Sequence, residues 1–323
     1  MIDAATVATL VSPDEALALA ESALRKTSSG AAHQDLRRTL DLPGESGTCL
    51  SVMYASLDGR MHFGAKVQSV FPQNFEHDLP SHQGGLFLFE KERGRPVALI
   101  NATAITGLRT PAATAVATRT LSRTDSSELA IIGYGEQAER HIAAISAVRP
   151  ISRVRVWGRN PERARAFAET QSSKGFRTEP MPTPKDAADR ADIVCTVTSA
   201  RLPVLQGEWL APGMHVNAVG ASVASLRELD FACVIRSNIW VDYMPMAMTA
   251  ASDLFEPLTQ GRIDRSRIVG EIGAVLNGEA PGRSSNSEIT LYRSLGVPAE
   301  DIELANFVYE KARRLGLGVE VAL

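Results

Sequence analysis

A glycine-rich turn at residues 133–138, GYGEQA, has the residue types and spacing that bind the pyrophosphate of a dinucleotide. It follows the apolar run LAII and opens a helical pattern, which is the context that the G-x-G-x-x-G/A fingerprint requires. Gly133 allows the tight turn, Gly135 lets the backbone approach the pyrophosphate, and Ala138 permits close packing of the helix on the strand. Glu136 and Gln137 open the helix, whose free N–H groups can bind the phosphates. A turn without a ligand is the alternative, and the strand-helix units on both sides of the motif argue against it.

The residues after the next strand, VRVW, bear on which nicotinamide cofactor is bound. An NAD site usually places an Asp or Glu there, about 20 residues after the turn, to bind the ribose 2′-hydroxyl. Here the strand is followed by Gly158, Arg159 and Asn160, and a guanidinium can pair with a 2′-phosphate. We therefore predict that NADPH is preferred, with NADH as the alternative cofactor. The non-functional interpretation is that Arg159 is a solvated loop cation.

Thr198 and Ser199 follow the third strand of this pattern, ADIVCTVT. The carboxyl ends of parallel strands meet at the edge of the sheet where such cofactors bind. We therefore expect both residues to contact the cofactor, and an ordinary turn is the alternative.

Arg109 stands in a segment otherwise suited to a buried helix, ITGLRTPAATAVATRTL at residues 105–121. A guanidinium keeps its charge in proteins, and its burial is costly unless an anion pairs with it. The sequence therefore predicts an anionic partner for Arg109. Thr110 is expected to cap the helix, with support of the arginine as the alternative, and it is also expected among the residues that contact the cofactor.

Lys66, in the strand pattern FGAKV, is a second candidate for chemistry. A lysine that points into a closed site loses solvation, and it can then donate a proton or bind a carboxylate. A lysine on an edge strand that reaches water is the alternative. The six histidines show no spacing typical of metal ligands, so no metal is expected.

Two patterns of secondary structure divide the chain near residue 122. Before it, a helix over about residues 12–26 precedes four strand patterns, TCLSVMYASL, MHFGAKVQSVF, GGLFLFE and RPVALINA, which predict a mostly antiparallel sheet. After it, strands and helices alternate from ELAII to RIVGEI, which predicts a parallel sheet. The expected fold class is α/β, with a Rossmann-type doubly wound parallel sheet and a second α+β domain.

The bulk composition excludes several classes of protein. The chain has 323 residues, of which 44% are hydrophobic and 22% charged, as in ordinary globular proteins. A net charge of −3 provides no excess of positive charge for nucleic acid, and no apolar run is long enough to span a membrane. Three dispersed cysteines and an N-terminus without basic residues before Arg25 favour a cytoplasmic protein.

With these motifs in view, the chain resembles the ornithine cyclodeaminase and mu-crystallin family over nearly its whole length. The resemblance is carried by FGAKVQSVFPQN, LPSHQGGLFLFE, ALINATAITGLRTPAATAVAT, IIGYGEQAERH, TVTSARLPVLQGEWLAPGMHVNAVGAS with RELD, and SLGVPAEDIELANFVYEKARRLGLG. It implies a homodimer of two-domain subunits, with substrate bound between the domains. Residues 1–122 and 297–323 would form the substrate-binding and dimerisation domain, including a C-terminal helix over about 299–315, and residues 123–296 the dinucleotide-binding domain.

The resemblance also implies roles for individual residues. Arg109, in ITGLRT, matches the arginine that binds the α-carboxylate of an amino or imino acid, and Lys66 matches the active-site lysine. Arg38, in LRRTL, matches a second substrate arginine, although Arg37 lies beside it and the alignment there is loose. His82 falls in a family block and is expected to line or support the substrate site, with a purely structural role as the alternative.

One position departs from the cyclodeaminase pattern. Cyclodeaminases and some alanine dehydrogenases of the family carry an Asp after the VGG or VGA turn, where this sequence has Ser222. A serine cannot replace that aspartate as a base at neutral pH. Mu-crystallin-like ketimine reductases, which use NADPH, also lack an acid there. Ser222 is accordingly expected in a substrate site of the ketimine reductase type.

These features predict an NADPH-dependent reductase of cyclic ketimine carboxylates. Its substrates would be Δ1-pyrroline-2-carboxylate or Δ1-piperideine-2-carboxylate, and its products L-proline or L-pipecolate. Arg109, Arg38 and Lys66 would hold the carboxylate, with Lys66 or a water as proton donor. The alternatives are a related amino-acid dehydrogenase or imine reductase, an NAD-dependent ornithine cyclodeaminase, and a non-catalytic protein that binds small molecules.

Overall fold

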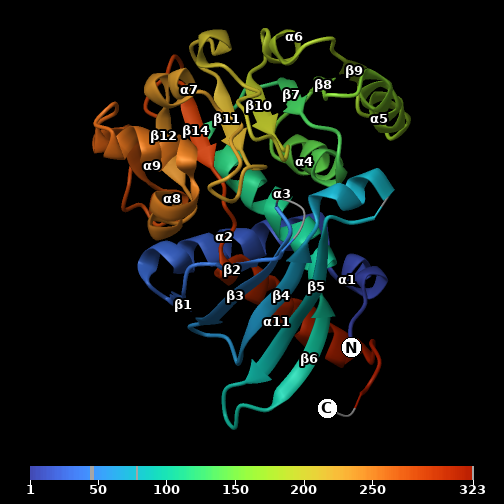
Figure 1. The fold of residues 1–323 in the computed structure, drawn as a ribbon. Helices are drawn as coiled ribbons and strands as arrows, with labels where there is room; N and C mark the ends of the chain where they lie inside the picture. The colour runs from blue at the N-terminus through green and yellow to red at the C-terminus, as the bar shows by residue number, and fades with distance from the viewer. Residues whose placement is uncertain (44–46, 78, 322–323) are drawn as a thin grey trace. The chain divides into compact units, whose positions relative to one another are not determined.

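The computed structural model describes residues 1–43, 47–77 and 79–321, which divide into two compact units (Figure 1). The first unit comprises Met1–Thr110 and Val297–Leu323, and the second comprises Pro111–Gly296. The first unit is therefore discontinuous in sequence. The boundary between Thr110 and Pro111 falls inside helix α3 (Ala102–Leu121), not at its end near residue 122.

The first unit is built on an antiparallel sheet. Its strand order is β1-β3-β4-β5-β6, with β2 also paired to β3. The four long strands match the predicted patterns, whereas the short strands β1 and β2 were not predicted. The strands are β1 (Ala32–Gln34), β2 (Arg38–Asp41), β3 (Cys49–Leu57), β4 (His62–Val70), β5 (His82–Glu90) and β6 (Pro96–Asn101).

Helices α1 (Ala4–Leu10), α2 (Pro13–Ser29) and α11 (Pro298–Leu315) belong to the same unit, as does the 3-10 helix η1 (Pro72–His77). Helix α11 crosses the sheet along β3 and β4 and also packs on α2 (Figure 1). The start of α2 is fixed by a capping box, in which Ser12 and Glu15 each accept a hydrogen bond from the other's backbone. Gly30, in the left-handed conformation, ends the helix, slightly beyond the predicted end near Lys26.

The second unit is built on a parallel sheet of order β13-β12-β14-β11-β10-β7-β8-β9, and all its pairings are parallel. This confirms the predicted α/β fold class. Strand β14 was not predicted, yet it lies between β11 and β12. The strands are β7 (Glu128–Ile132), β8 (Arg153–Trp157), β9 (Thr178–Pro180), β10 (Ile193–Thr196), β11 (His215–Ala218), β12 (Asn238–Val241), β13 (Ile268–Glu271) and β14 (Thr290–Arg293).

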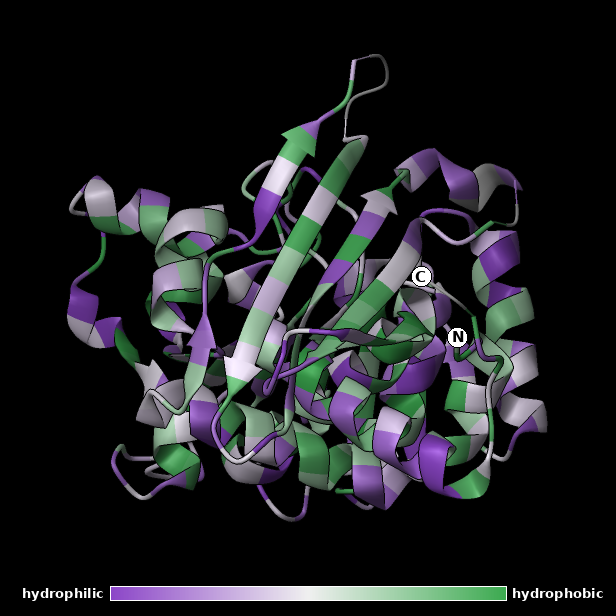
Figure 2. Ribbon diagram, turned by 90° about the horizontal axis from the view of Figure 1, so that it is seen from below, coloured by the Kyte–Doolittle hydropathy of each residue, from purple (hydrophilic) through white to green (hydrophobic). Residues whose placement is uncertain are grey.

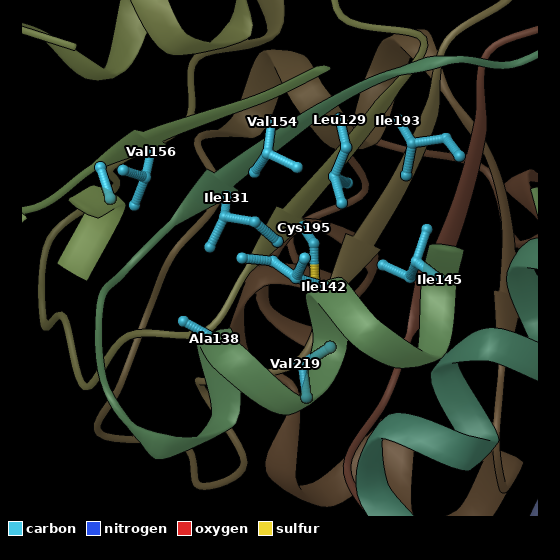
Figure 3. Close-up of a cluster of buried hydrophobic side chains, with 11 residues drawn as sticks. Leu129, Ile131, Ala138, Ile142, Ile145, Val154, Val156, Ile193, Cys195 and Val219 are labelled. Carbon is cyan, nitrogen blue, oxygen red and sulfur yellow. The ribbon is translucent and has the colours of Figure 1, made fainter. Parts of the chain in front are cut away.

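Helices connect these strands, and α4 packs its apolar side on β7, β8 and β10. Figure 3 shows Ala138, Ile142 and Ile145 of α4 facing strand residues such as Ile131 and Cys195. Ala138 is fully buried, so the small side chain lets the helix approach the strands as predicted. The helices are α4 (Glu136–Ser146), α5 (Pro161–Ser173), α6 (Pro184–Ala188), α7 (Phe231–Arg236), α8 (Met244–Ala250), α9 (Ser252–Thr259) and α10 (Ile272–Leu276), with 3-10 helices η2 (Gly207–Trp209) and η3 (Arg265–Arg267).

Helix α3 begins earlier than the sequence suggested. It follows β6 directly, and the side chain of Asn101 accepts a hydrogen bond from the Ala104 N–H at 2.9 Å. Asn101 therefore satisfies a free N–H group at the helix start. Arg109 and Thr110 lie about two turns inside the helix, so the expectation that Thr110 caps it was wrong. In the part of the chain that the structure describes, no helix has the length and apolar character needed to cross a membrane.

Candidate active site

Strand β4 places Lys66 on the buried face of the antiparallel sheet. Residues of β4 alternate in burial, and Lys66 stands between the buried Met53 and Leu86 of the neighbouring strands. Its side chain is 0% exposed, which rules out the alternative of an edge lysine in water. Apolar surroundings disfavour an ammonium ion, and burial lowers the pKa of Lys66 to about 8.

Two acidic residues of helix α11 meet Lys66 and Arg109. Glu300 and Asp301 lie in the first turn after Pro298, where the positive end of the helix dipole favours carboxylates. Asp301 contacts Lys66 Nζ at 2.7 Å and 2.9 Å through its two oxygens, and it accepts a hydrogen bond from Arg109 Nε at 3.2 Å. Glu300 Oε2 accepts one from Arg109 Nη1 at 2.8 Å. The anions that the burial of Arg109 requires are thus carboxylates of the protein itself.

Arg37 and His82 are coupled electrostatically to the same groups. Burial lowers the pKa of His82 to about 4, and the charges of Lys66, Arg37 and Arg109 contribute to the shift, so His82 is neutral at pH 7. Burial acts to raise the pKa of Asp301, but the charges of Lys66, Arg109 and Arg37 hold that pKa below its ordinary value. We refer to the following residues together as the buried ionic cluster, in which Arg37 and His82 are half-buried and the others buried: Arg37, Lys66, His82, Arg109, Glu300 and Asp301.

Arg38 is not part of this cluster. It opens strand β2 with a side chain that is 70% exposed, and it forms an ion pair with Asp35 at 2.9 Å. Asp35 also accepts a hydrogen bond from the Tyr54 hydroxyl at 2.8 Å. The charge of the neighbouring Arg37, in contrast, acts on the pKa of Lys66, so Arg37 rather than Arg38 lies near the cluster.

The glycine-rich turn of the second unit has the shape that a dinucleotide needs. Gly133 has φ of +126°, and a Cβ atom there would lie 2.8 Å from the Val197 carbonyl oxygen, so a side chain is excluded. A Cβ atom on Gly135 would meet nothing within 4 Å, and no side chain caps the start of α4 at this residue. Gln137 Oε1 is buried and has no hydrogen-bond partner among the described residues. Open space beside uncapped N–H groups fits a pyrophosphate.

The other predicted cofactor residues surround this turn or follow the neighbouring strands. Glu136 forms an ion pair with Arg140 at 2.9 Å within α4. Arg159 is exposed after β8, and Gly158 before it is covered by Tyr134, because a Cβ atom there would lie 1.9 Å from Tyr134 Cδ1. This contact of Tyr134 was not predicted from the sequence.

Glu228, which was also not predicted from the sequence, fixes the ends of two parallel strands. Its Oε1 accepts hydrogen bonds from the N–H and hydroxyl of Thr198 at 2.6 and 2.8 Å. Its Oε2 accepts from the Thr196 hydroxyl at 2.9 Å and from the N–H groups of Gly220 and Ala221 at 2.7 and 3.1 Å. Burial raises the pKa of Glu228, whereas these hydrogen bonds act to lower it.

The predicted site residues near Glu228 differ in exposure and in whether they bind its carboxylate. The Thr198 hydroxyl donates a hydrogen bond to Glu228, Ser199 is exposed, and Ser222 is half-buried just after the turn that Glu228 holds.

The paired acids after Pro298 were an available sequence signal for the buried ionic cluster, because acids on a buried helix need cationic partners. Glu228 gave no such signal, since its donors lie up to 32 residues away in the chain.

The profile of the ornithine cyclodeaminase/mu-crystallin family matches residues 1–315. The chain belongs to this family. The resemblance seen in the sequence blocks is thereby confirmed.

Relatives within the family are similar to this chain over almost their full lengths. A Δ1-pyrroline-2-carboxylate reductase from Bacillus cereus is 34% identical over 314 residues, covering 97% of this chain and 96% of the relative. The Δ1-pyrroline-2-carboxylate reductase of Thermococcus litoralis, solved with NADH and L-proline, superimposes with a TM-score of 0.95 at 34% identity, covering 99% of both chains. An archaeal alanine dehydrogenase dimer with bound NAD gives a TM-score of 0.92 at 30% identity, covering 99% of this chain and 98% of the other. On this evidence the chain is an oxidoreductase.

Proposed function

We propose that the protein is a nicotinamide-dependent reductase of small cyclic ketimine carboxylates, with Δ1-pyrroline-2-carboxylate as substrate and L-proline as product. The observation that carries this proposal is the meeting of two buried cations, Lys66 and Arg109, at one carboxylate, that of Asp301. An ammonium and a guanidinium held side by side suit the carboxylate of a small substrate. The similarity to two pyrroline-2-carboxylate reductases supports the same substrate.

Different residues of the cluster bind the substrate and donate the proton. The planar guanidinium of Arg109 suits a carboxylate, which fixes the substrate. Lys66 Nζ donates a proton to the imine nitrogen, because an iminium accepts hydride more readily than an imine. When bound at the glycine-rich turn, the cofactor supplies the hydride that reduces the imine carbon. Lys66 then regains its proton from solvent, so the imine gains one hydride and one proton in total.

The role of Lys66 predicts a pH dependence of the reduction. The pKa of Lys66 lies at about 8, below the ordinary value of 10.5, so the protonated form is lost as the pH rises through about 8. We expect kcat/KM to be constant below this value and to fall about tenfold per pH unit above it. A profile that stays flat from pH 7 to about 10 would show that Lys66 is not the proton donor.

The decisive test of the function is oxidation of NADPH or NADH by purified protein with pyrroline-2-carboxylate or piperideine-2-carboxylate, followed by nicotinamide absorbance. Rapid oxidation with formation of L-proline or L-pipecolate is expected. Two parallel assays test the alternatives. Ammonia release from ornithine with NAD would identify a cyclodeaminase, and reduction of pyruvate with ammonia would identify an alanine dehydrogenase, as the similarity to that enzyme suggests.

Cofactor preference is the finer part of the proposal, and it rests on Arg159. No acid stands at the end of β8, where Gly158, Arg159 and Asn160 follow the strand. The similar structures contain NADH or NAD, so both cofactors must be compared.

We expect Arg159→Ala to raise the KM for NADPH about tenfold and to leave the KM for NADH unchanged, because only the 2′-phosphate loses its partner. Arg165→Ala, on the exposed side of α5, is the control. Equal effects on both cofactors would contradict a role in selecting NADPH.

We further propose that the protein is a homodimer through the antiparallel sheet. One face of the sheet exposes large apolar residues, with Leu40 62% and Leu50 38% exposed as cross-strand neighbours, and Tyr54 and Phe63 exposed nearby. Hydrophobic stretches are visible along these strands in Figure 2. Exposed apolar patches of this kind often mark protein interfaces, and one similar structure is a dimer. The mass in solution, measured by light scattering, tests this proposal, and a monomer would contradict it.

A further inference from the structure

We propose that Asp301 is a positioning residue for the reduction, one that holds Lys66 and Arg109 in the arrangement that binds the substrate carboxylate. This inference rests on the proposed function. It assigns a role to a residue of helix α11, remote in sequence from both of its partners.

The contacts of Asp301 join two elements of the first unit through one carboxylate. One oxygen, Oδ1, accepts hydrogen bonds from both Lys66 Nζ at 2.9 Å and Arg109 Nε at 3.2 Å, and Oδ2 lies 2.7 Å from Lys66 Nζ. Lys66 comes from β4 and Arg109 from α3. The two cations would repel each other without a carboxylate between them. Asp301 is 1% exposed, so packing fixes its own position.

A second hydrogen bond limits the movement of Lys66. Its Nζ also donates to the Thr106 hydroxyl at 3.2 Å, one turn before Arg109 on the same helix. Asp301 and Thr106 thus define the direction of the ammonium group, whose flexible stem would otherwise allow several rotamers. Ordering such a side chain in advance lowers the entropic cost of substrate binding.

The first turn of helix α11, which carries Asp301, is itself held in place. Pro298 occupies the first turn, and the side chain of Gln34 accepts a hydrogen bond from the Ala299 N–H at 3.0 Å. Glu300 binds Arg109 from the neighbouring position at 2.8 Å. The helix therefore presents two carboxylates from a rigid support, as precise positioning requires.

A simple counter-ion and a positioning residue predict opposite results for the same substitution. If Asp301 only neutralised charge, Asp301→Asn would leave the cluster more positive and would bind a carboxylate more tightly. If Asp301 positions the cations, the same variant would bind it more weakly despite the added positive charge. At a pH below the descending limb of the variant's profile, where Lys66 stays protonated, the sign of the change in KM for pyrroline-2-carboxylate therefore decides between the two roles.

The expected result for Asp301→Asn is a rise in KM of about 10- to 100-fold, the range seen when groups that orient ligands are removed. The descending limb of the pH profile is expected to move below pH 8, since the charge of Asp301 acts to raise the pKa of Lys66. The other charged groups facing Lys66 are Arg109 and Arg37, which act in the opposite direction and stay in place. An unchanged or lower KM, or an unmoved pH profile, would overturn the proposal.

Glu303→Gln is the matched control for loss of stability. Glu303 is a buried acid two residues further along the same helix, and it pairs with Lys26 and Arg60 at 3.1 and 2.8 Å, outside the cluster. Thermal unfolding of both variants shows whether they are folded to a similar extent. The control is expected to lose stability while its KM and pH profile remain those of the unchanged protein.

A binding measurement separates this inference from the proposed function. Pyrrole-2-carboxylate, a planar carboxylate that cannot be reduced in this way, is titrated into the unchanged protein and into Asp301→Asn by calorimetry. Binding that weakens by about tenfold or more in the variant supports the positioning role even if the unchanged protein reduces neither ketimine. Equal or tighter binding overturns it, whether or not the enzyme is active.

Discussion

Replacing Arg109 with alanine is expected to lower kcat/KM for pyrroline-2-carboxylate by at least about hundredfold, which corresponds to about 3 kcal/mol. The substitution removes the planar donor group that the substrate carboxylate requires. It also leaves Glu300 and Asp301 facing the site with less positive charge. Steady-state reduction assays with the cofactor in excess measure this effect.

Arg109→Lys distinguishes loss of binding from loss of folding. The alanine variant removes the partner of two buried carboxylates, and such a loss costs about 3–5 kcal/mol of stability. Lysine keeps the charge but cannot form the two-pronged contact, so the Arg109→Lys variant should fold and still bind substrate poorly. Arg38→Ala is the control, because that side chain is 70% exposed and pairs with Asp35 outside the cluster. Wild-type kcat/KM in the lysine variant would contradict the proposed role.

Glu228→Gln is expected to destabilise the second unit by about 3 kcal/mol and to weaken cofactor binding. The carboxylate accepts three backbone N–H groups, from Thr198, Gly220 and Ala221. A glutamine amide would direct its own donors at one set of these groups, and the buried N–H groups would lose their acceptor. Thr198 stands at the end of the parallel sheet where cofactor contacts are expected, so displacement of this backbone also affects the cofactor.

Thermal unfolding and titration of protein fluorescence with NADH measure the two effects of Glu228→Gln separately. Thr196→Val serves as the control, since it removes only one hydroxyl donor to Glu228 and should cost about 1 kcal/mol. A Glu228→Gln variant as stable as the unchanged protein would show that the carboxylate is not needed at this position.

Local features of the sequence were sufficient for the fold class and for the glycine-rich turn. The helix that starts near residue 12, the strand pattern around Lys66, and the GYGEQA motif each depend on residues within about one turn or strand. Such interactions act in any tertiary context, and the structure contains the corresponding helix, strand and turn. The short strands β1 and β2 escaped prediction because edge strands of three or four residues show too little periodicity.

The start of helix α3 shows where a local interpretation failed. The expected cap at Thr110 required a helix that opens near Arg109, whereas the helix begins at Ala102. Tertiary packing outweighs the unfavourable propensity of an internal proline when the helix is buried, and most residues after Pro111 are buried. The position of Thr110 within the helix followed from this packing, which the sequence pattern did not show.

The sequence by itself determined that Arg109 needs an anion and that Lys66 belongs to a strand, whereas the burial of Lys66 came from the structure. Only the tertiary structure decided which anions are present, because Asp301 lies 192 residues from Arg109 and 235 from Lys66 in the chain. It also placed Arg37 with these groups and left Arg38 in solvent. The reason is that Coulomb interactions depend on distance in space, and in a buried site they act strongly between residues that only folding brings together.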